Sequence, residues 1–418
     1  MYDVIVVGAG AAGLLASAEA GRRGLRVLLC ERNRFPGAKL RITGKGRCNL
    51  TNDCGIREAL DNIPTGSNFL QSAFNALPPK SAMELFESLG LPLKTERGGR
   101  VFPVSDRASD VVGALLRYAR ESGVATVRCR VTGLELSGGA VSGAVAGDRR
   151  IPCRSAVLCT GGMSYPQTGS TGDGYAIAER LGHTIMPIRP SLVPLVARGE
   201  MCARLEGLSL KNVRLAIHRV GKRGAKTIFD EMGELLFTHF GISGPLTLSA
   251  SAHMGDFCDD SYTAVIDMKP ALDEDKLDAR ILRDFAENAN RDFVQMLRRL
   301  VPARMAPVIA DAAGIPPNTK VHSVTRGQRA ALRIALKRLT FEITGSRPIQ
   351  EAVITSGGIK LSEIDPKTMQ SKLVRGLHFA GEIIDADAYT GGFNLQIAWS
   401  TACAAGRNVL GARAFPGI

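Results

Sequence analysis

Several features that define other protein classes are missing from this sequence of 418 residues. No run approaches the roughly twenty consecutive apolar residues of a membrane-spanning helix. Residues 4–18 are apolar and small, but Asp3 stands where a secretory signal needs a basic start. The chain also has no internal repeat and no low-complexity segment. We therefore expect a globular cytoplasmic protein without a membrane span.

The nine cysteines lack the spacings that carry metal or redox chemistry. No two of them form a Cys-x-x-Cys pair, and none has metal-ligand spacing with a histidine. We therefore expect no metal site and no dithiol–disulfide relay, and we interpret the cysteines as reduced thiols packed mostly in strands. They are Cys30, Cys48, Cys54, Cys129, Cys153, Cys159, Cys202, Cys258 and Cys403.

Acidic residues are fewer than basic ones, 40 against 53, which gives a formal net charge of +13. Such a charge suits nucleic acid, an anionic membrane surface, a phosphate-bearing cofactor or an acidic substrate, but we prefer an ordinary solvated basic surface. Residues 320–338 contain six basic residues and no acid. Part of this stretch has helical spacing, and we prefer a solvated helix face there over a phosphate-binding one. Because aromatic residues are not interleaved with the basic ones, we do not expect a nucleic-acid partner.

The first thirty-one residues carry the strongest positive signal. An apolar run at residues 3–7 leads into Gly8, Gly10 and Gly13, then a helical segment, a second apolar run and Glu31. This order of strand, glycine turn, helix, strand and acid is typical of a βαβ unit that binds a dinucleotide. The helix N-terminus offers N–H groups to the pyrophosphate, and the acid accepts hydrogen bonds from ribose hydroxyls.

A second glycine-opened helix lies near the other end of the chain. An apolar strand ends at Gly381-Glu382, acids follow at Asp385 and Asp387, and Thr390-Gly391-Gly392 opens a helix. One dinucleotide pyrophosphate needs a single helix N-terminus, whereas a flavin also benefits from a second one beside its ring when it is reduced. The pair of helices therefore favours FAD over NAD, although an ordinary helix cap is the alternative at the second one.

A third glycine-rich segment runs from Thr160 to Gly174. The glycine pair at the end of an apolar strand, Gly161-Gly162, lets backbone approach a ligand closely. Tyr165 in this segment is a candidate proton donor or substrate contact.

Together these segments resemble the BaiN-like FAD flavoproteins, a family that also includes an aminoacetone oxidase. The matching pieces are VIVVGAGAAGL, GAKLRITGKGRCNLTN, GGMSYPQTGSTGDGYAIAERLGH, ELLFTHFGISGP, TSGGI and FAGEIIDADAYTGGFNLQIAWS. The resemblance implies an α/β fold: a Rossmann-like, glutathione-reductase-type FAD-binding domain, interrupted by an insertion with a small β-barrel and a helical subdomain. We expect residues 1–190 and 345–418 to form the FAD domain, 191–270 the barrel and 271–344 the helical part.

The resemblance also implies which residues surround FAD. Gly8, Gly10, Ala12 and Gly13 would surround the pyrophosphate, and Glu31 the adenosine ribose. Lys39, Arg41, Arg47, Cys48 and Asn49 would line the phosphate and flavin side, and Val131 would meet the adenine. Gly381, Glu382, Asp385, Gly392, Phe393, Asn394 and Gln396 would hold ribityl and isoalloxazine. Arg32, Thr160 and Gly161 complete the expected cofactor set.

These features predict an FAD-dependent oxidoreductase acting on a small molecule, with NAD(P)H-driven reduction of an activated C=C bond as the first hypothesis. A second GxGxxG after a strand is missing, so NAD(P)H would be only a transient electron donor. The alternatives are an amine oxidase that makes hydrogen peroxide and, in a different class, an RNA-binding or tRNA-modifying flavoprotein. The candidate catalytic residues are Tyr165, His239 and Arg47, and the oligomeric state stays open.

Overall fold

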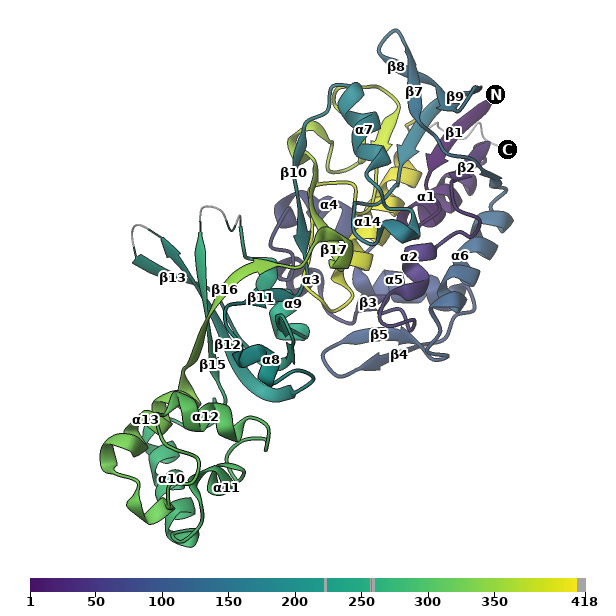
Figure 1. Cartoon of the computed structure of the whole chain (residues 1–418). Helices are drawn as coiled ribbons and strands as arrows, with labels where there is room; N and C mark the ends of the chain where they lie inside the picture. The colour runs from purple at the N-terminus through teal and green to yellow at the C-terminus, as the bar shows by residue number, and fades with distance from the viewer. Residues whose placement is uncertain (222–223, 256, 258–259, 412–418) are drawn as a thin grey trace. The chain divides into compact units, whose positions relative to one another are not determined.

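The computed structural model describes residues 1–221, 224–255, 257 and 260–411. The chain divides into two compact units, and each is described by itself. The first unit contains residues 1–191 and the chain from Pro348 onward, so it is built from both ends of the sequence (Figure 1). The second unit is Leu192–Arg347. The chain passes from one unit to the other within the proline-containing segment at residues 187–194.

The first unit is organised around a mostly parallel sheet with strand order β6-β2-β1-β9-β8-β7, in which β18 also pairs with β9. Strands β1, β2, β6, β9 and β18 run parallel. The apolar runs of β1, β2, β18 and the second half of β9 are buried, as expected for a parallel sheet covered by helices, whereas the edge strand β6 is mostly exposed. Strands β7 and β8 form an antiparallel hairpin beside β9. The bounds are β1 Tyr2–Val7, β2 Val27–Glu31, β6 Ala125–Arg128, β7 Gly133–Ser137, β8 Ala140–Ala146, β9 Arg149–Leu158 and β18 Leu377–Phe379.

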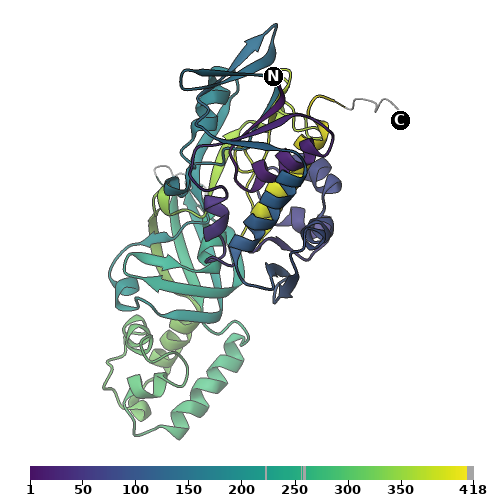
Figure 2. The same ribbon diagram turned by 90° about the vertical axis from the view of Figure 1, so that its right-hand side faces the viewer.

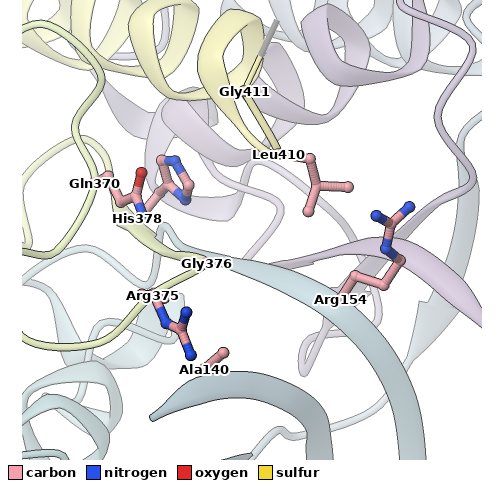
Figure 3. A pocket seen from close by; sticks show the side chains of 8 residues that line it. All are labelled: Ala140, Arg154, Gln370, Arg375, Gly376, His378, Leu410 and Gly411. Carbon is pink, nitrogen blue, oxygen red and sulfur yellow. The ribbon is translucent and has the colours of Figure 1, made fainter. Parts of the chain in front are cut away.

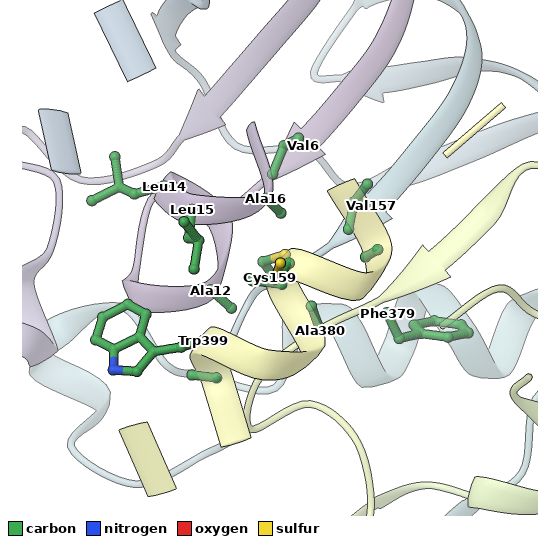
Figure 4. Packing of buried hydrophobic residues seen from close by; sticks show 14 of the residues in the cluster. Val6, Ala12, Leu14, Leu15, Ala16, Val157, Cys159, Phe379, Ala380 and Trp399 are labelled. Carbon is green, nitrogen blue, oxygen red and sulfur yellow. The ribbon is translucent and has the colours of Figure 1, made fainter. Parts of the chain in front are cut away.

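Helix α1 (Ala11–Gly21) packs against α14 (Phe393–Asn408) and α6 (Ala108–Glu121). Small residues on both helices permit the close approach of α1 and α14: a Cβ on Gly406 of α14 would lie 2.6 Å from the carbonyl oxygen of Ala16 in α1. Figure 4 shows Ala12 and Ala16 of α1 beside α14, with Trp399 next to Leu15. The buried Trp399 indole donates a hydrogen bond to the Leu50 carbonyl oxygen. The two helices opened by glycine thus share one core, although they are almost 400 residues apart in sequence.

Shorter elements surround this core. Residues 55–123 are mostly helical, and the segments that interrupt them become strands β4 and β5. These strands pair with each other, and β5 also pairs with β3. Strand β10 pairs with β17 in a separate two-stranded ladder. The bounds are α2 Ala38–Ile42, β3 Thr51–Asn52, α3 Ile56–Asp61, α4 Ser67–Ala76, α5 Pro79–Ser88, β4 Leu93–Glu96, β5 Arg100–Pro103, η1 Pro166–Thr168, α7 Asp173–Arg180, β10 Ile185–Ser191, η3 Ile349–Glu351, β17 Ile354–Ile359 and η4 Leu361–Glu363.

The second unit contains a closed antiparallel barrel with the order β11-β14-β13-β12-β15-β16. Its last strand comes after the helical segment, within residues that we assigned to the helical subdomain. The alternation of buried Leu339, Phe341 and Ile343 explains this placement, because every second residue points into the barrel. The bounds are β11 Leu195–Ala197, α8 Met201–Arg204, β12 Ser209–Gly221, β13 Gly224–Thr238, β14 Gly241–Ser243, α9 Pro245–Ser251, β15 Ser261–Asp267 and β16 Leu339–Ser346.

The helices between β15 and β16 form the helical part of this unit, drawn in green in Figures 1 and 2. They are α10 Glu274–Glu287, α11 Phe293–Leu297, α12 Ala306–Ala312, η2 Val321–Ser323 and α13 Arg326–Lys337.

The basic face of α13 differs in part from our expectation of a solvated face. Arg329 pairs with Asp278 at 3.0 Å, Arg333 with Glu274 at 3.5 Å and Lys337 with Asp267 at 2.6 Å. The acids come from α10, its N-terminus and the end of β15, a long way back in the sequence. Three cations of this face are therefore paired within the unit and only partly exposed, whereas Arg326 is exposed, so the expectation of a solvated face holds only in part.

The helices and the cysteines bear on two further expectations from the sequence. Within the described residues, no helix has the length and hydropathy needed to cross a membrane. The described cysteines are free thiols, and all but Cys129 are buried. Of the described cysteines, only Cys30 and Cys153 lie in strands, so the expectation that the cysteines pack mostly in strands was wrong; the others lie in helices and loops. Cys258 lies outside the described residues.

Candidate cofactor site

The carboxyl ends of three neighbouring parallel strands, β1, β9 and β18, form the edge at which the predicted cofactor residues gather. Each strand is followed at once, or within three residues, by a glycine with positive φ: Gly8 at 97°, Gly161 at 71° and Gly381 at 78°. Ligands of open α/β sheets bind outside this edge. The glycine turns predicted from the sequence are therefore brought together from three distant parts of the chain.

The glycines of the first turn have different structural reasons. A Cβ on Gly13 would lie 1.7 Å from the Gly8 carbonyl oxygen, and one on Gly8 would lie 2.6 Å from the Cys159 carbonyl oxygen. A Cβ on Gly10 would meet no protein atom within 4 Å. Protein packing thus explains Gly8 and Gly13 but not Gly10. A side-chain-free surface at Gly10 suits a ligand that approaches the backbone.

Gly10 is also the N-cap of α1, and no side chain caps this helix. The first turn of α1 carries no acidic residue. The N–H groups of the first turn of a helix lack partners within that helix, and they sum with the helix dipole to attract an anion. The geometry fits a pyrophosphate at this position.

Glu31, at the end of β2, is held firmly beside this turn. Its carboxylate accepts hydrogen bonds from the backbone N–H groups of Ala9 and Asn33, each at 2.7 Å. The residue is 8% exposed, so its carboxylate is fixed in position with lone pairs left for ribose hydroxyls. The neighbouring Arg32 donates to Thr171 and pairs with Asp173 at 3.1 Å.

The N-terminus of α14 repeats the same design. Its N-cap, Gly392, has a φ of 101° and no side chain caps the helix. A Cβ on Gly392 would lie 2.3 Å from the Thr51 carbonyl oxygen, so packing requires this glycine. The first turn carries no acid, and Phe393 begins the helix. A second uncapped helix end, of the kind that can attract an anion, therefore lies in the same unit as the first.

Two polar side chains of α14 that we expected to hold the flavin are engaged with protein groups. Asn394 accepts from the Ala388 N–H and donates to the carbonyl oxygens of Ala388 and Tyr389. Gln396 is fully buried and bonds Thr51, Ser400 and the Leu77 carbonyl oxygen. Their observed role is to shape the loop before the helix and to anchor its first turn.

A compact polar network links four segments beside the glycine turns. Lys39 Nζ lies 2.6 Å from Glu382 Oε2 and 2.6 Å from Ser164 Oγ. Glu382 Oε1 accepts from the Thr355 N–H at 2.8 Å and from Ser164 at 3.1 Å. Lys39 and Glu382 were predicted for the site, but Ser164 and Thr355 were not. In the sequence, these two residues were indicated only by lying within the motifs GGMSYPQTG and TSGGI, which support the family resemblance.

Two buried polar atoms near the glycine-rich segments lack hydrogen-bond partners among the described residues: Asn49 Oδ1 and Thr160 Oγ1. Buried polar atoms in folded proteins almost always have partners, so an orphaned one needs an explanation. Both belong to the predicted cofactor set. Together with the uncapped helices and the bare Gly10 surface, they fit a site completed by a nucleotide cofactor.

The loop after α2 carries Arg47, which was predicted to line the cofactor but is paired with acidic side chains of the protein. Arg47 pairs with Glu96 and with Asp106 at 2.6 Å, and its guanidinium lies 4.2 Å from the centre of the Phe102 ring. Lys94 and Arg47 both lower the pKa of Asp106 through hydrogen bonds. Arg47 is thus part of an ion-pair cluster beside the β3-β5-β4 sheet.

The side chains next to it in the sequence range from buried to exposed. Cys48 is completely buried, which raises the pKa of its thiol to about 12 and excludes a thiolate nucleophile at neutral pH. Arg41 is exposed, with a long contact of 3.4 Å to the Pro36 carbonyl oxygen. Val131 is buried beyond the end of β6.

The candidate catalytic residues lie in different units. Tyr165 directly follows Ser164 of the polar network and has a left-handed backbone with φ of 51°. The preceding residues are anchored because Thr355 Oγ1 accepts from the N–H groups of Met163 and Ser164. His239 belongs to the barrel unit, where it is exposed and lies 3.3 Å from Glu206.

Asp385 and Asp387 precede α14, and burial raises the pKa of both carboxyl groups. Asp387 is only 2% exposed and accepts hydrogen bonds from Ser191 at 3.0 Å and Ser356 at 3.1 Å. It was noted in the sequence but not assigned to the site. Its observed role is to join β10 and β17 to the loop before α14.

Comparison with known proteins gives a family match over nearly the whole chain. The family described as HI0933-like protein Rossmann domain matches residues 2–408. A ribosomal RNA dihydrouridine synthase of Escherichia coli strain K12 is 29% identical over 415 residues, which cover 99% of each chain. A 3-dehydro-bile acid delta(4,6)-reductase of Clostridium scindens is 29% identical over 414 residues, covering 97% of this chain and 98% of the relative.

A solved structure supports the architecture. The 3-ketosteroid delta1-dehydrogenase of Sterolibacterium denitrificans, in complex with 1,4-androstadiene-3,17-dione, aligns with a TM-score of 0.50 and 14% identity. The alignment covers 98% of this chain and 99% of that chain. At this identity the similarity shows the fold alone. The expected α/β fold with a Rossmann-type cofactor domain is confirmed.

Proposed function

Because the chain belongs to the HI0933-like Rossmann-domain family, a family of FAD-dependent oxidoreductases, we propose that it reduces a C=C bond conjugated to a carbonyl group. The prediction of an FAD-dependent oxidoreductase is confirmed at the level of the family. The type of bond, the substrate and the electron donor are the parts that we propose here.

The relatives' activities support the choice of bond. A delta(4,6)-reductase saturates C=C bonds of a 3-dehydro-bile acid, and dihydrouridine is uridine with its ring C=C bond saturated. In both substrates a carbonyl group conjugated to the C=C bond activates it toward hydride. Two relatives with different substrates thus share one reaction type, and this shared reaction is the observation that carries the proposal.

Residues of the first unit would hold the cofactor for this reaction. The N-terminus of α1 and the fixed carboxylate of Glu31 would bind the pyrophosphate and the ribose. The N-terminus of α14 would face the ring and stabilise negative charge there. Bound FAD supplies hydride transfer at N5. The Lys39–Glu382 pair, with Ser164 and Thr355, would keep the surrounding loops in register.

Saturation of a C=C bond also needs a proton at the second carbon. We assign this step to Tyr165, whose phenol can donate a proton. The anchoring of Met163 and Ser164 by Thr355 fixes the backbone that precedes it. Arg47 is tied up in ion pairs with Glu96 and Asp106, which makes it a weaker candidate.

Two substrate classes follow from the relatives: a free small molecule such as an enone, and a uridine within RNA. The net charge of +13 favours the RNA class, although the basic face of α13 is largely neutralised by ion pairs. RNA, which the sequence supported only as an alternative, therefore becomes a candidate partner. RNA binding that weakens steeply with salt would support it.

One anaerobic experiment separates these hypotheses. The FAD-loaded protein is mixed with NADPH or NADH and the flavin absorbance is followed; an enone, a uridine-containing RNA or an amine is then added. The proposal predicts bleaching by the nicotinamide and recovery of the colour with an enone or RNA, with two hydrogens added to the product. Bleaching by an amine, with peroxide formed in air, would instead establish the amine oxidase.

The variant Tyr165→Phe tests the proton donor. It should bleach with NAD(P)H at the normal rate but recover its colour with the second substrate more slowly, by about a hundredfold or more. Tyr2→Phe, in β1 of the same unit and away from the glycine turns, is the matched control.

A further inference from the structure

A pocket opens at the opposite edge of the central sheet from the glycine turns. Its volume is about 320 Å³, and Figure 3 shows its lining: Leu410 and Gly411 after α14 on one side, Ala140 of β8 on the other. The remaining lining residues are Arg154, Gln370, Arg375, Gly376 and His378. A volume of this size is at the lower end of small-molecule pockets and larger than a single ion needs.

His378, the central residue of β18, is the most informative lining residue. It is 1% exposed, and neither ring nitrogen has a hydrogen-bond partner among the described residues. Burial lowers the pKa of His378 to about 4; the Gly376 backbone opposes this shift without completing a hydrogen bond. The ring is therefore neutral at pH 7, with one donor and one acceptor nitrogen to satisfy. A buried group of this kind needs a partner.

Two arginines supply positive charge to the same pocket. Arg154 contacts Asp3 only at 3.5 Å, and Arg375 donates one bond, at 2.7 Å, to the Gly138 carbonyl oxygen. A guanidinium has five N–H donors in a planar fork, so most donors of both side chains stay available. Gln370 adds an amide that can donate or accept.

We propose that this pocket binds a small organic oxyanion, a carboxylate or a phosphate monoester. The guanidinium groups of Arg154 and Arg375 bind the anionic group, and Leu410 and Ala140 contact the carbon part. His378 and Gln370 bind a further polar group of the ligand.

This ligand is distinct from the hydride acceptor of the proposed reaction. Arg154 lies in β9 six residues before Thr160, which corresponds to about 20 Å along an extended strand. β18 and α14 each have one end at this pocket and the other at the glycine turns. The proposal therefore does not depend on the proposed function, and its ligand acts at the far end of two elements of the cofactor site.

Phenyl phosphate is a suitable probe, because it joins an oxyanion to an apolar ring. The FAD-loaded protein, with ¹⁵N-labelled histidine, is titrated with it while the flavin absorbance is followed. The signal of His378 is identified by its loss in His378→Phe. We expect a saturable shift of this signal and no release of FAD.

Arg154→Gln and Arg375→Gln should each weaken the binding about tenfold, since each removes a charge-assisted contact. Arg120→Gln, an exposed residue of α6, is the matched control and should bind as the parent does. Circular dichroism shows whether each variant is folded. Because the two arginines are replaced one at a time, a folded variant of either one is enough to test the proposal. Unchanged binding in both variants, displacement of FAD, or no saturable shift would overturn the proposal.

Discussion

Gly10 and Gly13 lie in the same turn, but the structure gives different reasons for a glycine at the two positions. The Cβ position of Gly13 is occupied by the Gly8 carbonyl oxygen, whereas that of Gly10 is clear of protein atoms. Gly10 also has a φ of −81°, which any residue adopts. The folded protein therefore needs glycine at position 13, whereas we propose that a bound nucleotide needs it at position 10.

This difference gives a paired prediction. Gly13→Ala should lower the free energy of unfolding by about 1–3 kcal/mol or more, because an extra methyl group is forced into packed backbone. Gly10→Ala should leave the unfolding of the apoprotein nearly unchanged but weaken FAD retention. Denaturant unfolding without FAD and flavin absorbance after gel filtration measure the two effects. Equal effects of both substitutions on the apoprotein would contradict this interpretation.

His378 gives a pH-dependent prediction at the same scale. Burial lowers its pKa to about 4, below its ordinary 6.5, so the unfolded chain binds a proton at higher pH than the folded chain does. Neutral His378 therefore contributes about 3 kcal/mol to the free energy of unfolding relative to its protonated form. This contribution is fully present above about pH 6.5 and is lost as the pH falls toward 4. Comparing parent and His378→Leu by urea unfolding at about pH 7.5 and 4.5 isolates this contribution. An identical pH dependence in both proteins would refute it.

Among the helices and strands, the sequence predicted those features that depend on residues close together in the chain. The βαβ unit with its glycine turn, the uncapped second helix and the strand before it all depend on residues that are neighbours in the sequence. The Lys39–Glu382 pair joins residues 343 positions apart, and no pattern in one sequence indicates such a contact. The closing barrel strand β16 was missed for the same reason, since its partners β11 and β15 precede the helices.

The basic face of α13 shows why a charge pattern alone does not predict a surface. Its spacing indicated one helix face, which is correct, but the acids that pair with it lie on other elements. Lys337 is the most enclosed of these cations: it pairs with Asp267 at 2.6 Å and donates to the carbonyl oxygens of Lys269 and Leu272. This arrangement ties the end of α13 to the segment between β15 and α10.

We predict that Lys337→Ala destabilises the protein by about 1–3 kcal/mol, because it leaves a half-buried carboxylate and two carbonyl groups without their donor. The adjacent Arg338→Ala is the control and should change stability by less than about 0.5 kcal/mol, since its side chain is exposed. Thermal unfolding of the two variants measures the difference. A Lys337→Ala protein as stable as the parent would rule out a structural role for the pair.

At the scale of the whole molecule, nearly all of the predicted site lies in the first unit, and only His239 lies in the second. The chain leaves and re-enters at neighbouring points, since β11 and β16 pair as Leu195 with Ser346 and the Arg347 N–H donates to the Pro194 carbonyl oxygen. A short linker can therefore replace the second unit.

A protein in which a glycine-serine linker replaces residues 192–347 should fold and bind FAD, because the first unit has its own core. Its flavin absorbance and circular dichroism measure both properties. A linker variant that folds but does not bind FAD would show that the second unit supplies essential cofactor contacts.

We infer that two helix ends opened by glycine, from opposite ends of the sequence, bind a single FAD. The most direct measurement is the visible spectrum of the purified protein, followed by identification of the nucleotide released on denaturation. We expect a yellow protein that releases about one FAD per chain, and an apoprotein that regains its colour with added FAD. A colourless protein that does not take up FAD but binds another nucleotide would refute this assignment.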